Sequence, residues 1–219
     1  MTDRIGIDIG GTFTDVVLLR DNGQFLVYKE DSTPDEPLRA ITQGLEGIAS
    51  DIGSTVENLL ASTDILVHGQ TMATNALIQR SGPAVGLLCT EGFRDIIHLG
   101  KGAKPERFNV HLQKPKDFIP RYLRLGVSER ITATGEIEKP LDENAVRKAA
   151  KTFLKHDVKA VAVAYLWSIL DPRHERRTAE ILREEMPDID VLCSADILPE
   201  IREWERTSST ILSAYIAPI

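Results

Sequence analysis

The chain has 219 residues, of which 42% are hydrophobic and 27% charged, and its formal net charge is −7. This composition is typical of a globular protein with a buried core. The acidic balance argues against a surface for nucleic acid or anionic membranes, because both attract positive charge. We therefore expect no nucleic acid and no membrane among its partners.

Residues 6–19 read GIDIGGTFTDVVLL and predict two strands joined by a glycine-rich turn. Ile5, Ile7 and Ile9 alternate with small or polar residues, so we expect them on the buried face of the first strand. Asp8 should lie on the other face. The second strand leads into an Asn-Gly pair, which favours a tight hairpin, and a third strand follows. The chain should therefore begin with an antiparallel hairpin meander.

The glycine-rich turn suggests a phosphate site, but two common kinds are excluded. A dinucleotide fingerprint needs a second glycine two positions after Gly6, where this chain has Asp8. The P-loop pattern G-x-x-x-x-G-K-[ST] occurs nowhere in the sequence. What remains is a hairpin in which the N–H groups of Gly10 and Gly11 and the hydroxyl of Thr12 face an anion.

Asp8 stands just before this turn, where a carboxylate can hold Mg²⁺ through water against the same phosphate. We therefore predict a magnesium role for Asp8. The alternative is an ordinary Gly-Gly hairpin with a solvated aspartate. The cluster D-x-G-G-T-x-T-D is more specific than a lone glycine pair, and its second threonine, Thr14, is included among the predicted cofactor-binding residues.

The next elements predict helices and parallel strands. Helical spacing of apolar residues predicts a helix over residues 34–53 and a shorter one over 55–63. A strand then ends at His68, a helix covers 71–80, and another strand covers 85–89. This order predicts a βαβ unit, so we expect its two strands to lie parallel in one sheet.

The second half of the chain alternates helices and strands after an irregular stretch. Residues 92–122 contain prolines and scattered basic residues without lasting periodicity, which is typical of a long functional or interface loop. Two strands about a Thr-Gly turn follow. Two helix-strand pairs are then predicted, at 142–157 with 159–166 and at 171–186 with 189–194. The sequence thus predicts an α/β protein with a mixed sheet.

Cys89 and Cys193 each stand near the end of an apolar run, which is typical of buried free thiols in a reducing cytoplasm. No Cys/His spacing resembles a zinc site. The amino terminus lacks the basic and then apolar pattern of a signal peptide, and no apolar run is long enough to span a bilayer. We therefore expect a cytoplasmic protein.

A second polar cluster, HGQTMATNAL, covers residues 68–77 and surrounds a strand-to-helix junction. Thr71 and Thr74 should lie in the first turn of the helix, with Asn75 close by, and helix N-termini bind anions. His68 should end a strand, where ligands collect in open α/β sheets. A satisfied core histidine and an ordinary capped helix explain the same pattern equally well.

The chain contains, in this order, the motifs GIDIGGTFTDVVL, HGQTMATNAL, GFRDIIHLG, DPRHERRTAEIL and LPEIREWERTSSTILSAYIAP. Together they resemble the amino-terminal part of the hydantoinase A/5-oxoprolinase family, which also contains ATP-dependent acetone and acetophenone carboxylase subunits. The resemblance implies a lobe of the actin-like ATPase, or ribonuclease H-like, fold. It also implies a lobe over residues 1–196 and, over 197–219, the start of a following ATPase domain.

The resemblance further implies an enzyme that uses ATP and Mg²⁺ to phosphorylate a carbonyl or enol oxygen of a lactam, hydantoin or ketone. This step would drive ring-opening hydrolysis or carboxylation, and it needs positioning and charge neutralisation rather than a protein nucleophile. Two sets of site residues are implied. The catalytic set is Asp8, His68 and Thr71. The cofactor-binding set is Gly10, Gly11, Thr12, Thr14, Thr74 and Asn75.

Two other functions would use the same hairpin. One is a sugar or acetate kinase, against which the HGQTMATNAL and ERTSSTILSAY segments argue. The other is a non-enzymatic actin-like domain in which ATP only switches a shape. Substrate-dependent phosphate release separates an enzyme from a switch.

The resemblance also implies partners. These are a hydantoinase B-type subunit, the downstream part of the same polypeptide, and a small cyclic amide or ketone as substrate. We expect the 219 residues alone not to hydrolyse ATP. Because the last segment, ILSAYIAPI, is apolar, we expect it to pack on another chain or to be poorly ordered.

Overall fold

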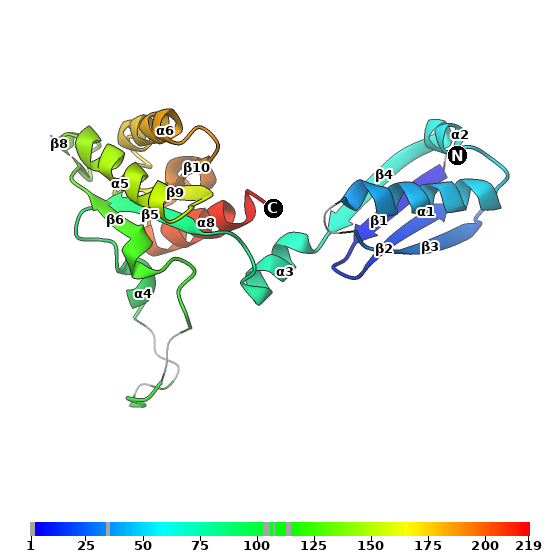
Figure 1. Cartoon of the computed structure of the whole chain (residues 1–219), viewed down its shortest axis with the longest axis horizontal. Coiled ribbons are helices and arrows are strands. Elements are labelled where there is room, and N and C mark those ends of the chain that lie inside the picture. The colour runs from blue at the N-terminus through cyan, green and yellow to red at the C-terminus, as the bar shows by residue number, and fades with distance from the viewer. Residues whose placement is uncertain (1–2, 34–35, 103–105, 107, 113–114) are drawn as a thin grey trace. The chain divides into compact units, whose positions relative to one another are not determined.

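The chain folds as two compact units, Met1–Gln79 and Arg80–Ile219, in a computed structural model (Figure 1). We call them the first and the second unit. The structure describes residues 3–33, 36–102, 106, 108–112 and 115–219.

The first unit is built on one four-stranded mixed sheet. Its strands are β1 (Asp3–Ile9), β2 (Phe13–Leu19), β3 (Phe25–Asp31) and β4 (Thr63–Gln70), in the order β3-β2-β1-β4. β2 runs antiparallel to both β1 and β3, whereas β4 runs parallel to β1. The predicted meander and the predicted mixed sheet are both confirmed.

Helix α1 (Pro37–Asp51) lies across one face of this sheet (Figure 1). Ile5, Ile7 and Ile9 are buried on that face, as the alternation predicted. Fully burying one such side chain stabilises a fold by about 1.5–3 kcal/mol. Gly47 lets the helix come close, because a β-carbon there would lie 2.2 Å from the Tyr28 ring.

Two shorter helices complete the first unit. Helix α2 (Val56–Ser62) precedes β4, and the Thr55 hydroxyl caps it by accepting a hydrogen bond from the Asn58 N–H at 3.3 Å. Helix α3 (Met72–Gln79) follows β4. Both helices agree with the sequence prediction, within a few residues at each end.

The other face of the first sheet carries apolar side chains that stay more than 40% exposed. They are Phe13, Leu19, Phe25, Val27, Ile65 and Val67. Monomeric proteins rarely leave so many neighbouring apolar side chains in water, so such a face is typical of an interaction surface.

The predicted βαβ unit over residues 63–89 is not formed. Strand β5 (Val85–Thr90) belongs to the second unit, where it pairs with other strands, while β4 pairs with β1. The prediction was wrong because helical and strand periodicity identify elements but do not say which strands pair. Here the division between the units falls directly after α3.

The second unit is built on a parallel sheet of β5, β6 (Arg124–Val127), β9 (Ala160–Ala164) and β10 (Asp190–Cys193), in the order β10-β9-β5-β6. Every residue of β5 and β9 is buried, as expected for a parallel sheet that is covered on both faces. A short antiparallel pair, β7 (Arg130–Ile131) and β8 (Ile137–Lys139), follows β6.

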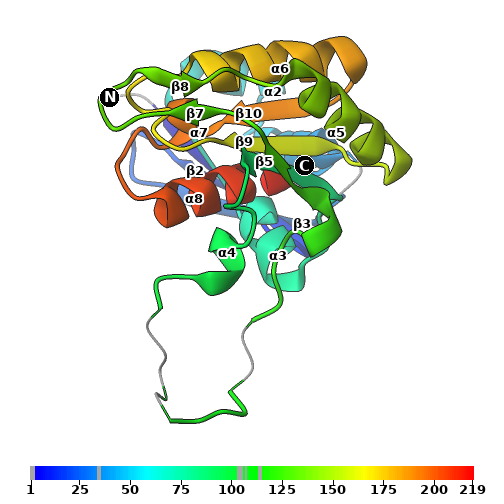
Figure 2. The same ribbon diagram turned by 90° about the vertical axis from the view of Figure 1, so that its left-hand side faces the viewer.

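Helices cover both faces of this sheet (Figure 2). Helices α5 (Glu143–Lys155) and α6 (Arg173–Glu185) pack together on one face, and α8 (Glu203–Ile216) packs against β9 and β10 on the other. The shorter elements are α4 (Ile96–Leu99), the 3₁₀ turn Arg121–Leu123 and α7 (Ser194–Ile197).

The last helix differs from its prediction. We expected the apolar terminal segment to pack on another chain or to be poorly ordered, but Ile211, Ala214 and Tyr215 of α8 are buried within the second unit. The two compact units divide between Gln79 and Arg80, and the predicted boundary at residue 196 stays a prediction. That residues 197–219 lead into a further domain stays a prediction.

A buried polar network joins α8 to the carboxyl ends of β9 and β10. The Glu175 carboxylate accepts hydrogen bonds from the Tyr165 N–H at 2.8 Å, the Ala195 N–H at 2.9 Å and the Ser194 hydroxyl at 2.6 Å. The Arg206 guanidinium donates to Ser194 Oγ at 3.0 Å and to the Tyr165 carbonyl at 2.7 Å. The edge where ligands often bind in open α/β sheets is therefore filled here by the chain itself.

The two cysteines, Cys89 and Cys193, are buried and unpaired, which confirms the predicted free thiols. Burial raises the pKa of each thiol to about 12, so neither forms the reactive thiolate near neutral pH. Among the described residues, no helix is long and apolar enough to cross a membrane.

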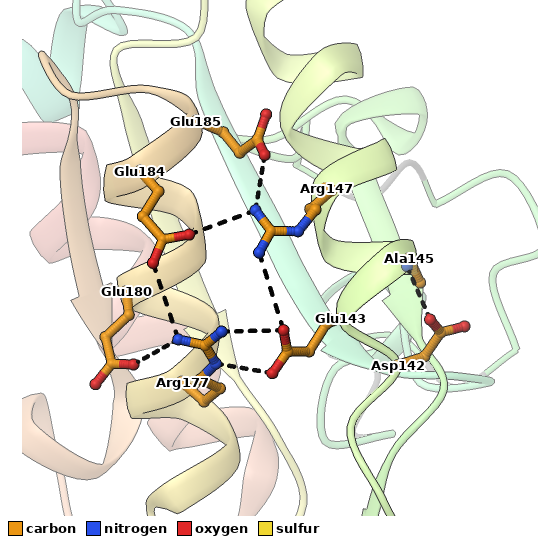
Figure 3. Close-up of polar contacts among 8 residues, drawn as sticks. All are labelled: Asp142, Glu143, Ala145, Arg147, Arg177, Glu180, Glu184 and Glu185. Atoms are coloured by element: carbon orange, nitrogen blue, oxygen red, sulfur yellow. Dashed lines mark hydrogen bonds and ion pairs between the residues drawn. The ribbon is translucent and has the colours of Figure 1, made fainter.

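On the outer surface of the second unit, an ion-pair network ties α5 to α6 (Figure 3). Arg177 donates to both oxygens of Glu143, at 2.8 and 3.0 Å, and to Glu180 at 2.9 Å. Arg147 donates to Glu185 at 2.8 Å and approaches Glu184 at 3.4 Å. Pairing with these carboxylates raises the pKa of both arginines.

Replacing Arg177 with Met should lower the melting temperature at low salt, because the bidentate pair with Glu143 is lost while most of the apolar stem is kept. The difference from the unchanged chain should shrink in about 1 M NaCl, where the screening length is only about 3 Å. Arg176→Met is the control, since Arg176 approaches a carboxylate only at 4.0 Å. Differential scanning calorimetry gives the melting temperatures of the unchanged chain and of the two variants at low and high salt. Equal losses in the two variants, or a loss independent of salt, would contradict a role for the network.

Candidate functional site

The turn between β1 and β2 is held from one side by Ser32. The Ser32 hydroxyl donates to the Gly10 carbonyl at 2.8 Å, and the Ser32 N–H donates to the Thr12 carbonyl at 2.9 Å. In a trans peptide the C=O and the following N–H point in opposite directions. With the Gly10 carbonyl fixed on Ser32, the N–H of Gly11 therefore points away from Ser32.

Three donors remain available at this turn. Among the described residues, the N–H groups of Gly11 and Thr12 and the Thr12 hydroxyl have no hydrogen-bond partner, and both residues are exposed. The Gly10 N–H is not available, because it donates to the Phe13 carbonyl at 2.9 Å. This corrects the prediction that Gly10 offers its N–H to an anion. Gly10 instead closes the turn.

Thr14 also has a different role from the predicted one. It is fully buried, and its hydroxyl lies 3.0 Å from the Ser32 hydroxyl. Because Ser32 donates to the Gly10 carbonyl, Thr14 donates to Ser32 and so supports the turn indirectly. Its side chain presents no exposed atom to a cofactor in this structure, which a pattern of threonines along a strand cannot reveal.

Asp8 lies on the open face of the sheet, in a row formed by one residue from each strand. The row runs from Lys29 on β3 through Asp15 and Asp8 to Gly69 on β4. Lys29 Nζ lies 2.7 Å from Asp15, and a β-carbon at Gly69 would lie 3.7 Å from Asp8 Oδ1. Asp8 is therefore exposed, as predicted, with a second carboxylate directly opposite it.

The pair of carboxylates fits a hydrated magnesium ion better than an all-protein metal site. No group of three or more His, Cys, Asp or Glu side chains that could hold a metal occurs within the described ranges. Mg²⁺ usually keeps several waters and takes only one or two carboxylates together with substrate phosphates. Lys29 already offsets the charge of Asp15, so Asp8 is the carboxylate of this row that a hydrated cation would serve.

The strand-to-helix junction 68–77 reaches the same turn. The Thr71 N–H donates to the Ile9 carbonyl at 3.1 Å, which places the start of α3 at the end of β1. A β-carbon at Gly11 would lie 3.0 Å from Asn75 Nδ2. The structure thus brings Thr71 and Asn75 next to the glycine turn, while Thr74 is exposed in the first turn of α3.

His68 does not join this group. It pairs in register with Ile7, so it lies on the sheet face opposite to that of Asp8, although it remains exposed. The predicted catalytic set of Asp8, His68 and Thr71 is therefore not assembled on one face. Because side chains of a strand alternate between faces, a histidine one register position from Gly69 cannot point the same way as Asp8.

A small pocket of about 50 Å³ opens behind the turn, between Ile9, Gly10, Gly11, Ser32, Thr33, Pro37 and Met72. It is far smaller than the several hundred Å³ of typical small-molecule pockets, so this part of the chain can grip only a fragment of a ligand.

Two residues of the site were not among the predicted ones. Asp15 has a sequence signal, since it follows the turn as Asp8 precedes it and the hairpin register makes them neighbours. Ser32 has none, because it lies 22 residues from Gly10 and reaches the turn only through the pairing of β2 with β3.

Gly10 and Gly11 should differ in their tolerance of a side chain. A β-carbon at Gly10 would lie 2.9 Å from the Phe13 carbonyl, part of the backbone, whereas at Gly11 it would meet only the Asn75 amide. Gly10→Ala should therefore cost about 1–3 kcal/mol of unfolding free energy. Gly11→Ala should cost less, because a side chain can move. Urea denaturation measures both, and a greater loss for Gly11→Ala would contradict this geometry.

The family pattern described as the hydantoinase/oxoprolinase N-terminal region matches residues 4–186. Among curated proteins, the chain is 38% identical to the caprolactamase subunit alpha of Pseudomonas jessenii, over 99% of this chain and 31% of that protein. It is 40% identical to the acetophenone carboxylase gamma subunit of Aromatoleum aromaticum, over 97% of this chain and 31% of that protein.

Solved structures agree. A nucleotide-free structure of acetone carboxylase matches with a TM-score of 0.88 and 32% identity, over 99% of this chain and 32% of that one. The ATP-dependent caprolactamase of Pseudomonas jessenii matches with a TM-score of 0.85 and 39% identity, over 98% and 31%. The chain thus spans about a third of the length of these relatives. It belongs to the hydantoinase/oxoprolinase family and corresponds to its N-terminal region.

Proposed function

We propose that the chain is the N-terminal part of an ATP-dependent enzyme subunit of the actin-like ATPase fold. The enzyme would phosphorylate a carbonyl or enol oxygen of a lactam, hydantoin or ketone, and so drive ring-opening hydrolysis or carboxylation. The observation that carries this proposal is the glycine turn, where the available donors of Gly11 and Thr12 lie at the end of the strand that carries Asp8. Relatives named as ATP-dependent support it.

In this proposal ATP supplies the phosphoryl group, and the chain binds and orients its phosphates. The N–H groups of Gly11 and Thr12 and the Thr12 hydroxyl donate to phosphate oxygens. Asp8, with Asp15 opposite, holds Mg²⁺ through water and so offsets phosphate charge. Ser32 keeps the turn in the shape that exposes these donors.

Thr71, Thr74 and Asn75 line the same end of the first unit. We propose that Asn75, whose amide lies beside Gly11, contacts the phosphates directly, and that the first turn of α3 adds its N–H groups. His68 lies on the other face of the sheet, so we assign it no step beside Asp8.

Partners belong to this proposal as well. The relatives are named as subunits, and the exposed apolar face of the first sheet is suited to cover by more polypeptide. We propose that a downstream part of a longer polypeptide and a hydantoinase B-type subunit supply the rest of the enzyme, in the cytoplasm. The small pocket behind the turn also suggests that the remaining walls of a nucleotide site come from elsewhere.

Phosphate release by the complete enzyme separates the possible reactions. The assay would offer caprolactam, 5-oxoproline, hydantoin, acetone and acetophenone one at a time, with Mg²⁺ and ATP. Release that depends on one of them supports the proposal and names the branch. Phosphate release that is the same with and without these compounds would support a switch domain instead. Transfer of the phosphoryl group to a sugar or to acetate would support a kinase.

Asp8→Asn in the complete enzyme should lower ATP turnover by about 100-fold or more, because the charge that holds the metal ion is lost. Folding should be unaffected, since Asp8 is exposed. The matched control is Asp64→Asn, which removes an exposed carboxylate from β4 of the same sheet. Steady-state kinetics at varied Mg²⁺ concentration measure the ATP turnover of both variants. Normal turnover in Asp8→Asn, or an equal loss in Asp64→Asn, would contradict the magnesium role.

A further inference from the structure

The second unit contains a pocket of about 710 Å³ that the proposed ATP reaction does not use. Its described lining includes residues of α4, of the stretch 115–118 and of α8, and α4 and α8 lie side by side (Figure 2). Its volume falls within the range of about 300–1,000 Å³ that is typical of small-molecule sites. The chain therefore has a second cavity, one large enough for a whole small molecule.

One face of α8 forms a wall of this pocket. Trp204, Ser208, Ile211 and Leu212 all line it, at the spacing that places residues on one side of a helix. The helical spacing of these residues is already visible in the sequence. Packing of α8 on the sheet explains only the part of the helix that faces β9 and β10. The helix thus turns one stripe toward β9 and β10 and an adjacent stripe toward the pocket.

Contacts outside the pocket hold the Phe118 ring in position. The Phe118 ring, which also lines the pocket, packs edge-on against Tyr215 with ring centroids 5.2 Å apart. The Tyr215 hydroxyl accepts a hydrogen bond from the Gly82 N–H at 2.8 Å. These contacts hold the aromatic lining before any ligand arrives, which lowers the ordering cost of binding.

Two cationic side chains stand over the aromatic lining. The Arg80 guanidinium lies 4.4 Å from the centre of the Phe118 ring, and Lys101 Nζ lies 5.3 Å from the centre of the Trp204 ring. Such contacts attract a cation to the ring face. Both residues are exposed, and their charged groups lie over the rim of the aromatic lining.

The balance of charge around the pocket is positive. Arg80, Lys101 and Lys116 line it, whereas Asp117 is the acidic side chain in the described lining. The Asp117 carboxylate already lies 2.9 Å from His98 and 3.3 Å from the buried Arg124.

Glu205, next to Trp204 in the chain, pairs with Lys101. The hydrogen bond from Lys101 lowers the pKa of Glu205, so this carboxylate is ionised near neutral pH. Because Lys101 is matched by Glu205, and Asp117 lies between His98 and Arg124, the positive balance of the lining comes from Arg80 and Lys116. The pocket is thus a local basic site in a chain whose net charge is −7.

The indole N–H of Trp204 is buried and has no hydrogen-bond partner among the residues that the structure describes. Its nitrogen lies beside Gly100, where a β-carbon would be 3.9 Å away. Because this atom is closed off from the pocket, a ligand would contact the ring of Trp204 and not its N–H.

From these contacts we propose that this pocket binds a small organic anion, with a carboxylate joined to an apolar ring or chain. The carboxylate lies against Lys101 and Arg80, and the apolar body lies against Phe118, Trp204 and Leu212. The proposal does not depend on the ATP reaction, since all of its residues belong to the second unit.

The test uses the 219-residue chain with Trp167→Phe, which leaves Trp204 as the sole tryptophan. It is titrated with 4-phenylbutyrate, with the neutral 4-phenylbutan-1-ol and with the cationic 4-phenylbutylamine. The carboxylate should change Trp204 emission saturably and, by calorimetry, bind about tenfold or more tightly than the alcohol, a difference of about 1.4 kcal/mol. Equal binding of acid and alcohol, or no saturable change with the acid, would overturn the proposal.

Two substitutions locate the binding site. Lys101→Met and Arg80→Met should each weaken 4-phenylbutyrate binding by about tenfold, a change of about 1.4 kcal/mol, and leave the weak binding of the alcohol unchanged. The control is Lys148→Met, which removes the same charge from the exposed surface of α5. It should change the binding of neither 4-phenylbutyrate nor the alcohol. Melting curves confirm that each variant is folded. Undiminished binding of the acid in both pocket variants would show that these cations do not form the site.

Discussion

The pairing register of β1 is the constraint on which the phosphate site depends. This strand lies between β2 and β4, and burial of Ile5, Ile7 and Ile9 under α1 decides which way its side chains point. A shift by one residue would bury Asp8 and expose the isoleucines, at a cost of several kcal/mol. The core of the first unit thereby places the carboxylate on the open face and the glycine turn at the end of the strand.

The two units differ in whether the polar groups at one end of their sheets have hydrogen-bond partners within the fold. At the glycine turn of the first unit, backbone donors are left exposed and a single side chain, Ser32, gives the turn its shape. At the carboxyl edge of the second sheet, by contrast, Glu175 and Arg206 satisfy the polar groups within the fold. A fully satisfied buried network favours rigidity, whereas exposed donors favour binding. This contrast explains why we assign the phosphate chemistry to the first unit.

Much of the fold follows from the sequence, because periodicity reports the environment of each element. Alternation identified the buried face of β1, and helical spacing identified α1, α5 and α6. Pairing between distant elements was not predictable in the same way. The sequence suggested that β4 and β5 share a sheet, and it grouped His68 with Asp8, yet the register separates both pairs. Thr14 resembled a ligand residue, but its burial makes it a support for Ser32.

The account is tested most directly at the amide groups of the turn. Backbone amide resonances of the ¹⁵N-labelled 219-residue chain would be followed during titration with ATP, with and without Mg²⁺. We predict the largest shifts at Gly11 and Thr12, strengthened by Mg²⁺, and little change at Gly23 in the hairpin at the other end of β2. Shifts that are absent at Gly11 and Thr12, or no larger than those at Gly23, would contradict a phosphate site at this turn.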